Sequence, residues 1–354
     1  MLKTVRSTFK PEDVTLLLSD ITGTVTPLPS EIREKKIQSG THYCEMLPLE
    51  KKPSEKYLEL YKLALENHSE ETANAAAAVS EKILLKYKHP VLVSLARAGI
   101  SAGILIKRYI KARYNIDAPH YAISIIRGKG IDKNAVEYIL SHHKAEDIVF
   151  VDGWTGKGAI LRTLTEALKA YPSIAPRLAV LADPAYITDL CGTHEDFLIA
   201  GSCLNCTVSG LISRTFLRSD IIGEKDFHGC AYYGELISED RTYEFIDTVY
   251  KNMDLDYSLP EFSETADINS GYDEALSIAE QYNVSDINFI KPGIGETTRV
   301  LLRRIPWKVL VRDMTDTKYI CHILRLAEEN NVPVEEYPLK KYRACGIIKN
   351  LSDL

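Results

Sequence analysis

The sequence predicts an α/β protein in which a parallel sheet is flanked by helices and followed by a small C-terminal αβα domain. Between residues 90 and 200, short apolar runs alternate with segments of helical spacing, an order typical of parallel strands joined by right-handed crossovers. Charge supplies a second observation, because residues 286–354 carry 12 Lys and Arg against 9 Asp and Glu, whereas residues 1–285 are acidic overall. A basic C-terminal part therefore follows an acidic first part.

The elements of the first part follow in chain order. The alanine-rich stretch 69–87 favours a helix. Apolar runs predict strands at 91–94, 121–126, 148–151 and 178–181. Helical spacing between these runs predicts helices at 104–114, 133–142 and 159–170. A last strand is expected at 197–200, at the edge of the sheet.

Domain organisation follows from length and local composition. With 354 residues the chain exceeds the usual size of one domain. The segment around Pro260 is acidic and polar with few periodic apolar positions, which is typical of a linker. We expect a first domain over residues 1–255 with its core at about 85–215, a linker over 256–270 and a second domain over 271–354.

Composition excludes several classes of protein. The 45% hydrophobic and 26% charged residues are typical of a globular protein, and a net charge of -6 restricts any nucleic-acid site to a local patch. The longest apolar run, 91–106, is too short to span a bilayer and contains Arg97. The N-terminus has no signal peptide pattern, and the seven cysteines are odd in number, which together predict a cytoplasmic protein with reduced thiols.

Three loops that follow successive predicted strands combine glycine with cationic side chains. Because the carboxyl ends of parallel strands meet at one edge of the sheet, we expect these loops to converge there on an anionic ligand. Backbone amides freed by glycine and a helix N-terminus would be the donors. The candidate residues are Arg97, Ala98, Gly99, Arg127, Lys129, Asp152, Trp154, Thr155, Gly156, Lys157, Gly158 and Ala159.

These segments resemble two related groups of proteins. Residues 91–99 look like the pyrophosphate loop of type I phosphoribosyltransferases, and residues 148–159 look like their signature for phosphoribosyl pyrophosphate (PRPP). Asp152 matches the first acid of that signature, whereas Gly153 stands in place of the second. A closer resemblance, to the phosphoribosyltransferase-like proteins of tellurite-resistance and stress operons, also labelled cysteine protease StiP, covers residues 39–43, 151–160 and 190–214.

The resemblance implies a type I phosphoribosyltransferase-like fold and the transfer of ribose 5-phosphate from PRPP to an acceptor, such as a base or a nucleoside-like metabolite. The loop from Thr155 to Ala159 would hold the 5-phosphate. Arg97, with the amides of Ala98 and Gly99, would hold pyrophosphate, and Asp152 would contact the ribose hydroxyls.

The remaining loop residues receive roles from the same resemblance. Arg127 and Lys129 would neutralise charge on the leaving group. Trp154 would either stack on a base or cover the end of the sheet as a loop aromatic. Mg²⁺ would bridge pyrophosphate and ribose oxygens, with few ligands from the protein. A hood over the acceptor would be built by residues 1–60 and 215–250.

Two short-spaced groups, Cys191–His194 and Cys203–Cys206, leave three interpretations open. Cys-x-x-His with Cys-x-x-Cys matches a tetrahedral zinc ligand set. Alternatively, Cys191 or Cys203 is a thiolate nucleophile activated by His194, with Asp196 or Asn205 orienting the imidazole. In the third interpretation the cysteines are buried and behave as small hydrophobes in a turn after an edge strand.

The basic C-terminal part contains a glycine-rich turn before a helix. Strands are expected at 309–311 and 332–334, with a helix at about 319–330 between them. The turn and this order resemble the pelota-type RNA-binding domain, which implies structured RNA or tRNA as a partner and phosphate contacts through basic side chains. The residues concerned are Lys291, Gly293, Gly295, Glu296, Thr297 and Arg299.

Three functional hypotheses result. The first is a phosphoribosyltransferase-type glycosyltransferase whose C-terminal domain binds RNA. The alternative enzyme is a cysteine peptidase that uses Cys191 or Cys203 with His194. The third is a non-catalytic sensor of phosphoribosyl compounds or RNA, which the missing second acid at Gly153 favours.

Overall fold

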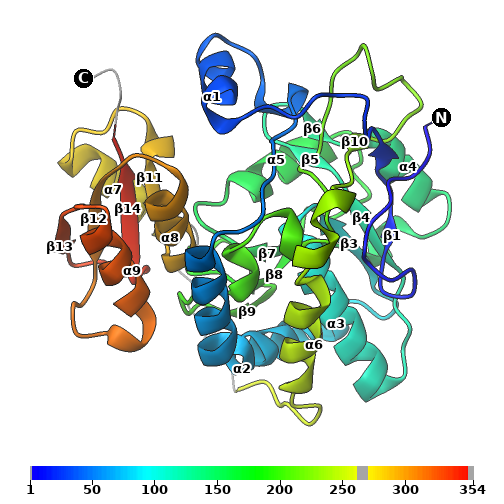
Figure 1. Cartoon of the computed structure of the whole chain (residues 1–354). Coiled ribbons are helices and arrows are strands. Elements are labelled where there is room, and N and C mark those ends of the chain that lie inside the picture. The colour runs from blue at the N-terminus through cyan, green and yellow to red at the C-terminus, as the bar shows by residue number, and fades with distance from the viewer. Residues whose placement is uncertain (1, 261–269, 350–354) are drawn as a thin grey trace.

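The structure is a computed structural model that describes residues 2–260 and 270–349. Figure 1 shows a larger body built by the first 251 residues, with the C-terminal elements gathered beside it. Most of the predicted linker over 256–270 lies outside the described residues, so the domain boundaries stay a prediction.

A six-stranded parallel sheet forms the centre of the larger body. Its strand order is β1-β4-β3-β7-β8-β9, and every neighbouring pair is parallel. The strands are β1 (Thr15–Leu16), β4 (His120–Ile123), β3 (Val91–Leu95), β7 (Ile148–Trp154), β8 (Leu178–Ala182) and β9 (Cys191–Thr193). A parallel sheet with flanking helices is therefore confirmed.

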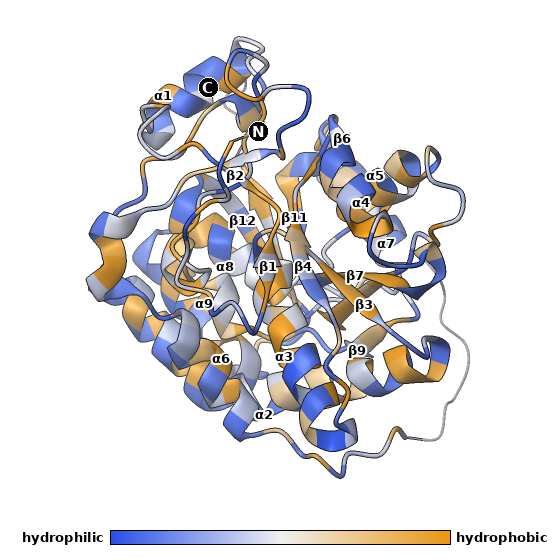
Figure 2. Ribbon diagram, turned by 90° about the vertical axis from the view of Figure 1, so that its right-hand side faces the viewer, coloured by the Kyte–Doolittle hydropathy of each residue, from blue (hydrophilic) through white to orange (hydrophobic). Residues whose placement is uncertain are grey.

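Helices cover both faces of this sheet because alternate strand residues point to opposite sides. Leu92 and Val149 pack in the core shared with α2 (Glu55–Lys86), α3 (Ala98–Tyr114) and α6 (Thr242–Lys251). Val93 and Phe150 pack on the opposite face, against α4 (Lys133–Leu140) and α5 (Ala159–Leu168). Figure 2 shows β3 and β7 as largely hydrophobic ribbons between these layers, as expected for parallel strands buried on both sides.

Two glycines allow the central helices to approach the sheet closely. A Cβ at Gly192 would lie 2.1 Å from the carbonyl oxygen of Ala75, so β9 can pack on α2 only with glycine there. A Cβ at Gly99 would lie 2.3 Å from the carbonyl oxygen of Val151. Gly99, expected to turn amides toward an anion, is thus required by the packing of α3 on β7.

Local differences from the expected elements have physical causes. The strand expected at 121–126 is divided, because Gly128 at φ 78° turns the chain into the hairpin of β5 (Ile125–Ile126) and β6 (Gly130–Ile131). The segment 197–200 is not a strand, since Phe197, Leu198 and Ile199 all pack into one core, and the edge strand is β9. The remaining elements of this body are β2 (Ser19–Asp20), α1 (Ser30–Gln38) and β10 (Gly229–Cys230).

The C-terminal part is a four-stranded sheet with helices on both faces. Its strand order is β11-β14-β12-β13, in which only β12 and β13 are parallel neighbours. Its elements are α7 (Ser270–Gln281), β11 (Ile290–Pro292), α8 (Ile294–Arg303), β12 (Pro306–Val311), α9 (Thr317–Glu329), β13 (Val334–Glu336) and β14 (Ala344–Ile348). Ile294 and Leu301 of α8 belong to the same apolar core as β3 and β7, so the two parts pack as one body.

None of the helices in the described residues has both the length and the apolar composition that a membrane-spanning helix needs. The longest of them, α2, begins at Glu55, well before the helix expected from residue 69. It carries buried alanines where it meets the sheet and charged residues elsewhere.

Candidate functional site

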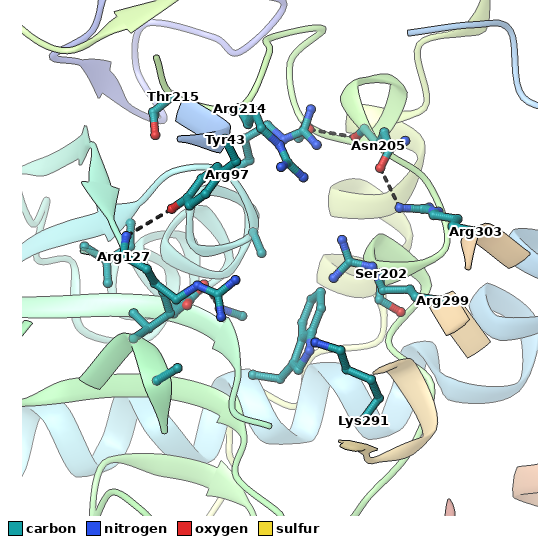
Figure 3. Close-up of a pocket in the computed structure, with 18 of the residues that line it drawn as sticks. Tyr43, Arg97, Arg127, Ser202, Asn205, Arg214, Thr215, Lys291, Arg299 and Arg303 are labelled. Atoms are coloured by element: carbon teal, nitrogen blue, oxygen red, sulfur yellow. Dashed lines mark hydrogen bonds between the residues drawn. The ribbon is translucent and has the colours of Figure 1, made fainter. Parts of the chain in front are cut away.

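A cavity of about 1830 Å³ lies at the carboxyl edge of the large sheet, between that edge and the C-terminal part. The loops after β3 and β7 line it from one side, and the segment before β11 and helix α8 line it from the other. Figure 3 shows Arg97, Arg127 and Arg214 from the first part facing the same space as Lys291, Arg299 and Arg303 from the second.

The lining of this cavity is strongly cationic although the whole chain has a net charge of -6. Among the lining residues whose side chains the structure describes, two are acidic, Glu31 and Asp152. The ten cationic ones are Lys35, Arg97, Arg127, Arg162, Arg214, Lys291, Arg299, Arg303, Arg304 and Lys349. Such a concentration of one sign of charge favours anions.

Several of these cations are held in place by the protein. Arg97 donates from Nη1 to the carbonyl of Ile212 at 3.0 Å and lies 3.5 Å from the carboxylate of Glu50. Arg303 donates from Nη1 to Oδ1 of Asn205 at 2.6 Å and from Nη2 to the carbonyl of Cys203 at 2.9 Å. Arg303 therefore joins the C-terminal part to the first body (Figure 3).

Two other cations have no such partner. Among the described residues, no hydrogen-bond acceptor or carboxylate pairs with the head groups of Arg214 and Lys291. Burial, followed by the neighbouring Arg97, lowers the pKa of Arg214 to about 10. Burial also lowers the pKa of Lys291, against the opposing effect of Glu296. Both head groups would gain from a bound anion.

Asp152, the expected ribose ligand, lines the same cavity. Its Oδ1 accepts the amide of Gly153 at 2.8 Å, and burial raises the pKa of its carboxyl to about 7. In protein sites Mg²⁺ is held by one or two carboxylates together with phosphates and waters. Among the described lining residues Asp152 and Glu31 are the acidic ones against ten cations, so the donor set suits an anion better than Mg²⁺.

The glycine loop after β7 makes contacts other than the expected phosphate cradle. Lys157 donates from Nζ to the carbonyl of Ile290 at 2.7 Å and also to that of Ile287, and burial lowers its pKa to about 8. The hydroxyl of Tyr342 donates to the carbonyl of Gly156 at 2.6 Å. The loop thus joins the first body to the C-terminal part.

Other loop residues are distributed between the cavity and the protein interior. Ala98, Trp154 and Ala159 line the cavity together with Arg97 and Arg127. The hydroxyl of Thr155 donates to Asp183 in the interior. Gly158 adopts φ 74° at the start of α5, and Lys129 is an exposed residue of the β5–β6 turn.

The residues expected to bind RNA are likewise divided. Lys291 and Arg299 line the cavity, and Arg299 is paired with Glu296 at 3.1 Å. The amide of Ile294 donates to Oδ1 of Asp196 at 2.9 Å, so the turn at Gly293 packs against the first body. Gly295 and Glu296 border a second, smaller pocket, and the buried hydroxyl of Thr297 donates to the carbonyl of Lys291 at 3.3 Å.

Cys191 and His194 form a close pair at the edge strand β9. Sγ of Cys191 lies 3.4 Å from Nε2 of His194, and Nδ1 of His194 donates to the carbonyl of Asp183 at 2.7 Å. This leaves Nε2 free to accept the thiol proton. Cys191 is only 1% exposed, and burial raises the pKa of its thiol to about 11.

A ring and a cation cover this pair. Tyr186 stacks on His194 with ring centroids 3.9 Å apart and an interplanar angle of 5°. Lys341 of the C-terminal part lies 3.9 Å from the centroid of the Tyr186 ring. Residues of both parts therefore lie over the imidazole.

Cys203 is placed differently. It is fully buried, and burial raises the pKa of its thiol to about 12. Within the described residues, one group of three metal-type ligands lies within 4.8 Å, and it consists of Asp183, Cys191 and His194. The four-ligand zinc arrangement with Cys203 and Cys206 is therefore not assembled, and it is Cys191 that lies beside His194.

Sequence reasoning missed Arg214 and Arg303, and it assigned no role to a second thiol pair. Nδ1 of His42 lies 2.9 Å from Sγ of Cys44, while Nε2 lies 3.1 Å from the carbonyl of Arg127 at the rim of the cavity. The spacing of His42 and Cys44 was a signal for this pair. No local pattern marks the two arginines, because tertiary folding alone brings them to the cavity.

Comparisons with known proteins agree with this two-part structure. A family model described as tellurite-like stress resistance cysteine protease StiP matches residues 7–250, and the PELOTA RNA binding domain matches residues 269–350. A curated protein of Acinetobacter baylyi (strain ATCC 33305 / BD413 / ADP1), named cysteine protease StiP, is 33% identical over 363 residues. The match covers 97% of this chain and 94% of that protein.

These matches correct the first functional hypothesis. The family model and the relative are both named as cysteine proteases, so the prediction of a phosphoribosyltransferase-type glycosyltransferase acting on PRPP is wrong. The structure supplies a physical reason, because Lys157 and Gly156 of the expected phosphate loop are engaged by the C-terminal part. The PELOTA match agrees with the expected C-terminal domain type.

Proposed function

The chain belongs to the family of tellurite-like stress resistance cysteine protease StiP, and from this membership we propose that it is a cysteine peptidase with Cys191 as nucleophile and His194 as general base. The observation that carries the assignment is the position of His194, between Sγ of Cys191 at 3.4 Å and the carbonyl of Asp183 at 2.7 Å. A nucleophile, a base and a group that orients the base are the three parts such catalysis needs.

The proposed reaction uses these atoms in two steps. Sγ attacks the carbonyl carbon of a peptide bond while Nε2 of His194 takes the thiol proton. The same proton passes from Nε2 to the departing amine as the C–N bond breaks, which leaves an acyl thioester on Cys191. Water, deprotonated by His194, then hydrolyses the thioester and restores the thiol.

Burial determines how the proton moves. A thiol whose pKa is raised to about 11 is neutral near pH 7, so Cys191 of the resting enzyme is a thiol instead of a thiolate. Proton transfer then accompanies attack. Because Cys191 is 1% exposed and Tyr186 stacks on His194, a peptide can reach the thiol and the imidazole only after the residues around them move.

Single cysteine variants of the full chain test the assignment. With unfolded casein as substrate, Cys191→Ala should lower the release of acid-soluble peptides to background, a loss on the order of 10³-fold. The matched variants Cys203→Ala and Cys44→Ala, each also removing a buried thiol, should keep the activity. Activity that persists in Cys191→Ala, or that disappears only in Cys44→Ala, would contradict the assignment.

We also propose that the C-terminal part binds RNA, a function that the PELOTA match and the cavity-facing Lys291 and Arg299 support. Phosphate contacts release counterions, so the affinity should fall steeply with salt. Fluorescence anisotropy of the full chain with a labelled RNA tests this, and Arg299→Gln should weaken binding. Affinity that stays equal across a salt series in both Arg299→Gln and Lys291→Gln would refute it.

A further inference from the structure

We propose that the cavity between the two parts is a composite chamber for the end of a single RNA strand, with phosphates held jointly by Arg97 and Arg214 of the first body and by Lys291, Arg299 and Arg303 of the C-terminal part. This inference rests on the proposed RNA binding and deepens it. It is independent of the peptidase assignment, because Cys191 and His194 do not line this cavity.

The charge of the residues that line the cavity supports binding of a polyanion. Of the described residues that line the cavity, ten are cationic and two are acidic, in a chain whose overall charge is -6, so positive charge is concentrated there. Arg97 and Arg299, from the two parts, both repel the charged form of Arg214. The cations of the two parts therefore share one field, which a multiply charged anion would neutralise.

The cationic head groups in the cavity differ in whether the protein already holds them in place. Arg97 and Arg303 are oriented by backbone carbonyls and by Asn205, so their positions do not depend on a ligand. Among the described residues, neither Arg214 nor Lys291 pairs with a carboxylate or a hydrogen-bond acceptor, and both line the cavity. Arg214 lies over the ring of Tyr43, with its Cζ 5.8 Å from the ring centroid. Two cations without an anionic partner, beside two anchored ones, form a site prepared for phosphate groups.

Size and lining select an RNA strand. A cavity of about 1830 Å³ exceeds the roughly 300–1,000 Å³ of ordinary small-molecule sites. The lining is not only cationic, because Tyr43, Trp154 and Phe289 supply partly exposed aromatic surface. Cations for the backbone and aromatic rings for unstacked bases are the combination that binds single strands.

Binding by the full chain tests the chamber. The ligand is an RNA of about ten nucleotides with a 5′-phosphate and a 3′-fluorophore, followed by anisotropy over a salt series. Arg214→Gln and Lys291→Gln should each weaken binding about tenfold and reduce the salt slope by about 0.7, the effect of one lost phosphate contact. The control Lys144→Gln removes an exposed cation that precedes the amino end of β7, away from the cavity, and should leave binding unchanged.

The outcomes separate this inference from RNA binding itself. If Lys291→Gln and Arg299→Gln weaken binding while Arg214→Gln does not, the C-terminal part binds RNA alone and the composite chamber is wrong. If none of the three weakens binding, both proposals fail. Displacement of the RNA by ATP at an equal concentration of phosphate groups would overturn the strand assignment in favour of a free nucleotide. Arg214→Lys keeps the charge and should restore most of the affinity, which guards against a folding defect in Arg214→Gln.

Discussion

The buried thiol of Cys191 allows a quantitative prediction about its reactivity. Its pKa is raised from 9.0 to about 11 by burial. At about pH 7.5 the thiolate fraction is then about 0.03%, against about 3% for a thiol of pKa about 9. Because the thiolate is the reacting species, alkylation of Cys191 should be roughly 100-fold slower than that of an ordinary accessible thiol, before limited access is considered.

Site-resolved alkylation with iodoacetamide, followed by peptide mass spectrometry, measures this rate. The exposed Cys321 serves as an internal reference in the same sample. The rate at Cys191 should rise about tenfold for each unit of pH up to about pH 10, because the thiolate fraction rises in that proportion below the pKa. Alkylation of Cys191 within a few fold of Cys321 at about pH 7.5, or a rate that levels off below about pH 9, would refute the reasoning.

Three further predictions concern packing, docking and titration. Gly192→Ala should destabilise the chain by at least about 1–3 kcal/mol in a denaturant melt, because its Cβ would lie 2.1 Å from the carbonyl oxygen of Ala75 in α2. The control Gly156→Ala should be nearly neutral, because the nearest atom to its Cβ is 3.9 Å away. Lys157→Met should cost about 1–3 kcal/mol in the same melt, because the carbonyls of Ile287 and Ile290 lose their charged donor; an unchanged melt would contradict this contact. The pKa of Asp152 is raised to about 7, so its folded form binds a proton above the unfolded pKa near 3.8, and lowering the pH between these values favours the folded state. RNA affinity should therefore rise as the pH falls from about 8 to about 6, because this carboxyl loses its negative charge. Asp152→Asn should abolish that rise. The same pH profile of RNA affinity in the variant and in the unaltered chain would contradict this role of Asp152.

The order of the central elements could be predicted from sequence because each strand is a short apolar run bounded by turn residues. Val91 and Ile148 begin strands where the pattern places them. The glycines were harder to interpret, since a glycine that opens a loop to a ligand has the same local sequence as one that permits close packing. Gly99 was assigned to an anion, and its neighbour in the structure is the carbonyl of Val151.

The site was only partly predictable for a related reason. Arg97 and Arg127 were found because they follow strands at a known edge of a parallel sheet. Lys157 follows such a strand too, yet its direction depends on a C-terminal part that local sequence does not place. Cys191 and His194 were identifiable from their i,i+3 spacing, whereas the placement of Cys203 away from His194 depends on the path of the chain after the edge strand.

Asp183 connects two regions that have been described separately. Its main-chain oxygen orients His194, while its carboxylate accepts the Thr155 hydroxyl and the amides of Ile187 and Thr188. Evolutionary change at this aspartate would thus alter both the imidazole and the loop that meets the C-terminal part. Substitutions at the proposed catalytic pair, Cys191 and His194, and in the loop after β7 that contacts the C-terminal part are therefore expected to occur together. Relatives that lose one of these features should show altered residues in the other.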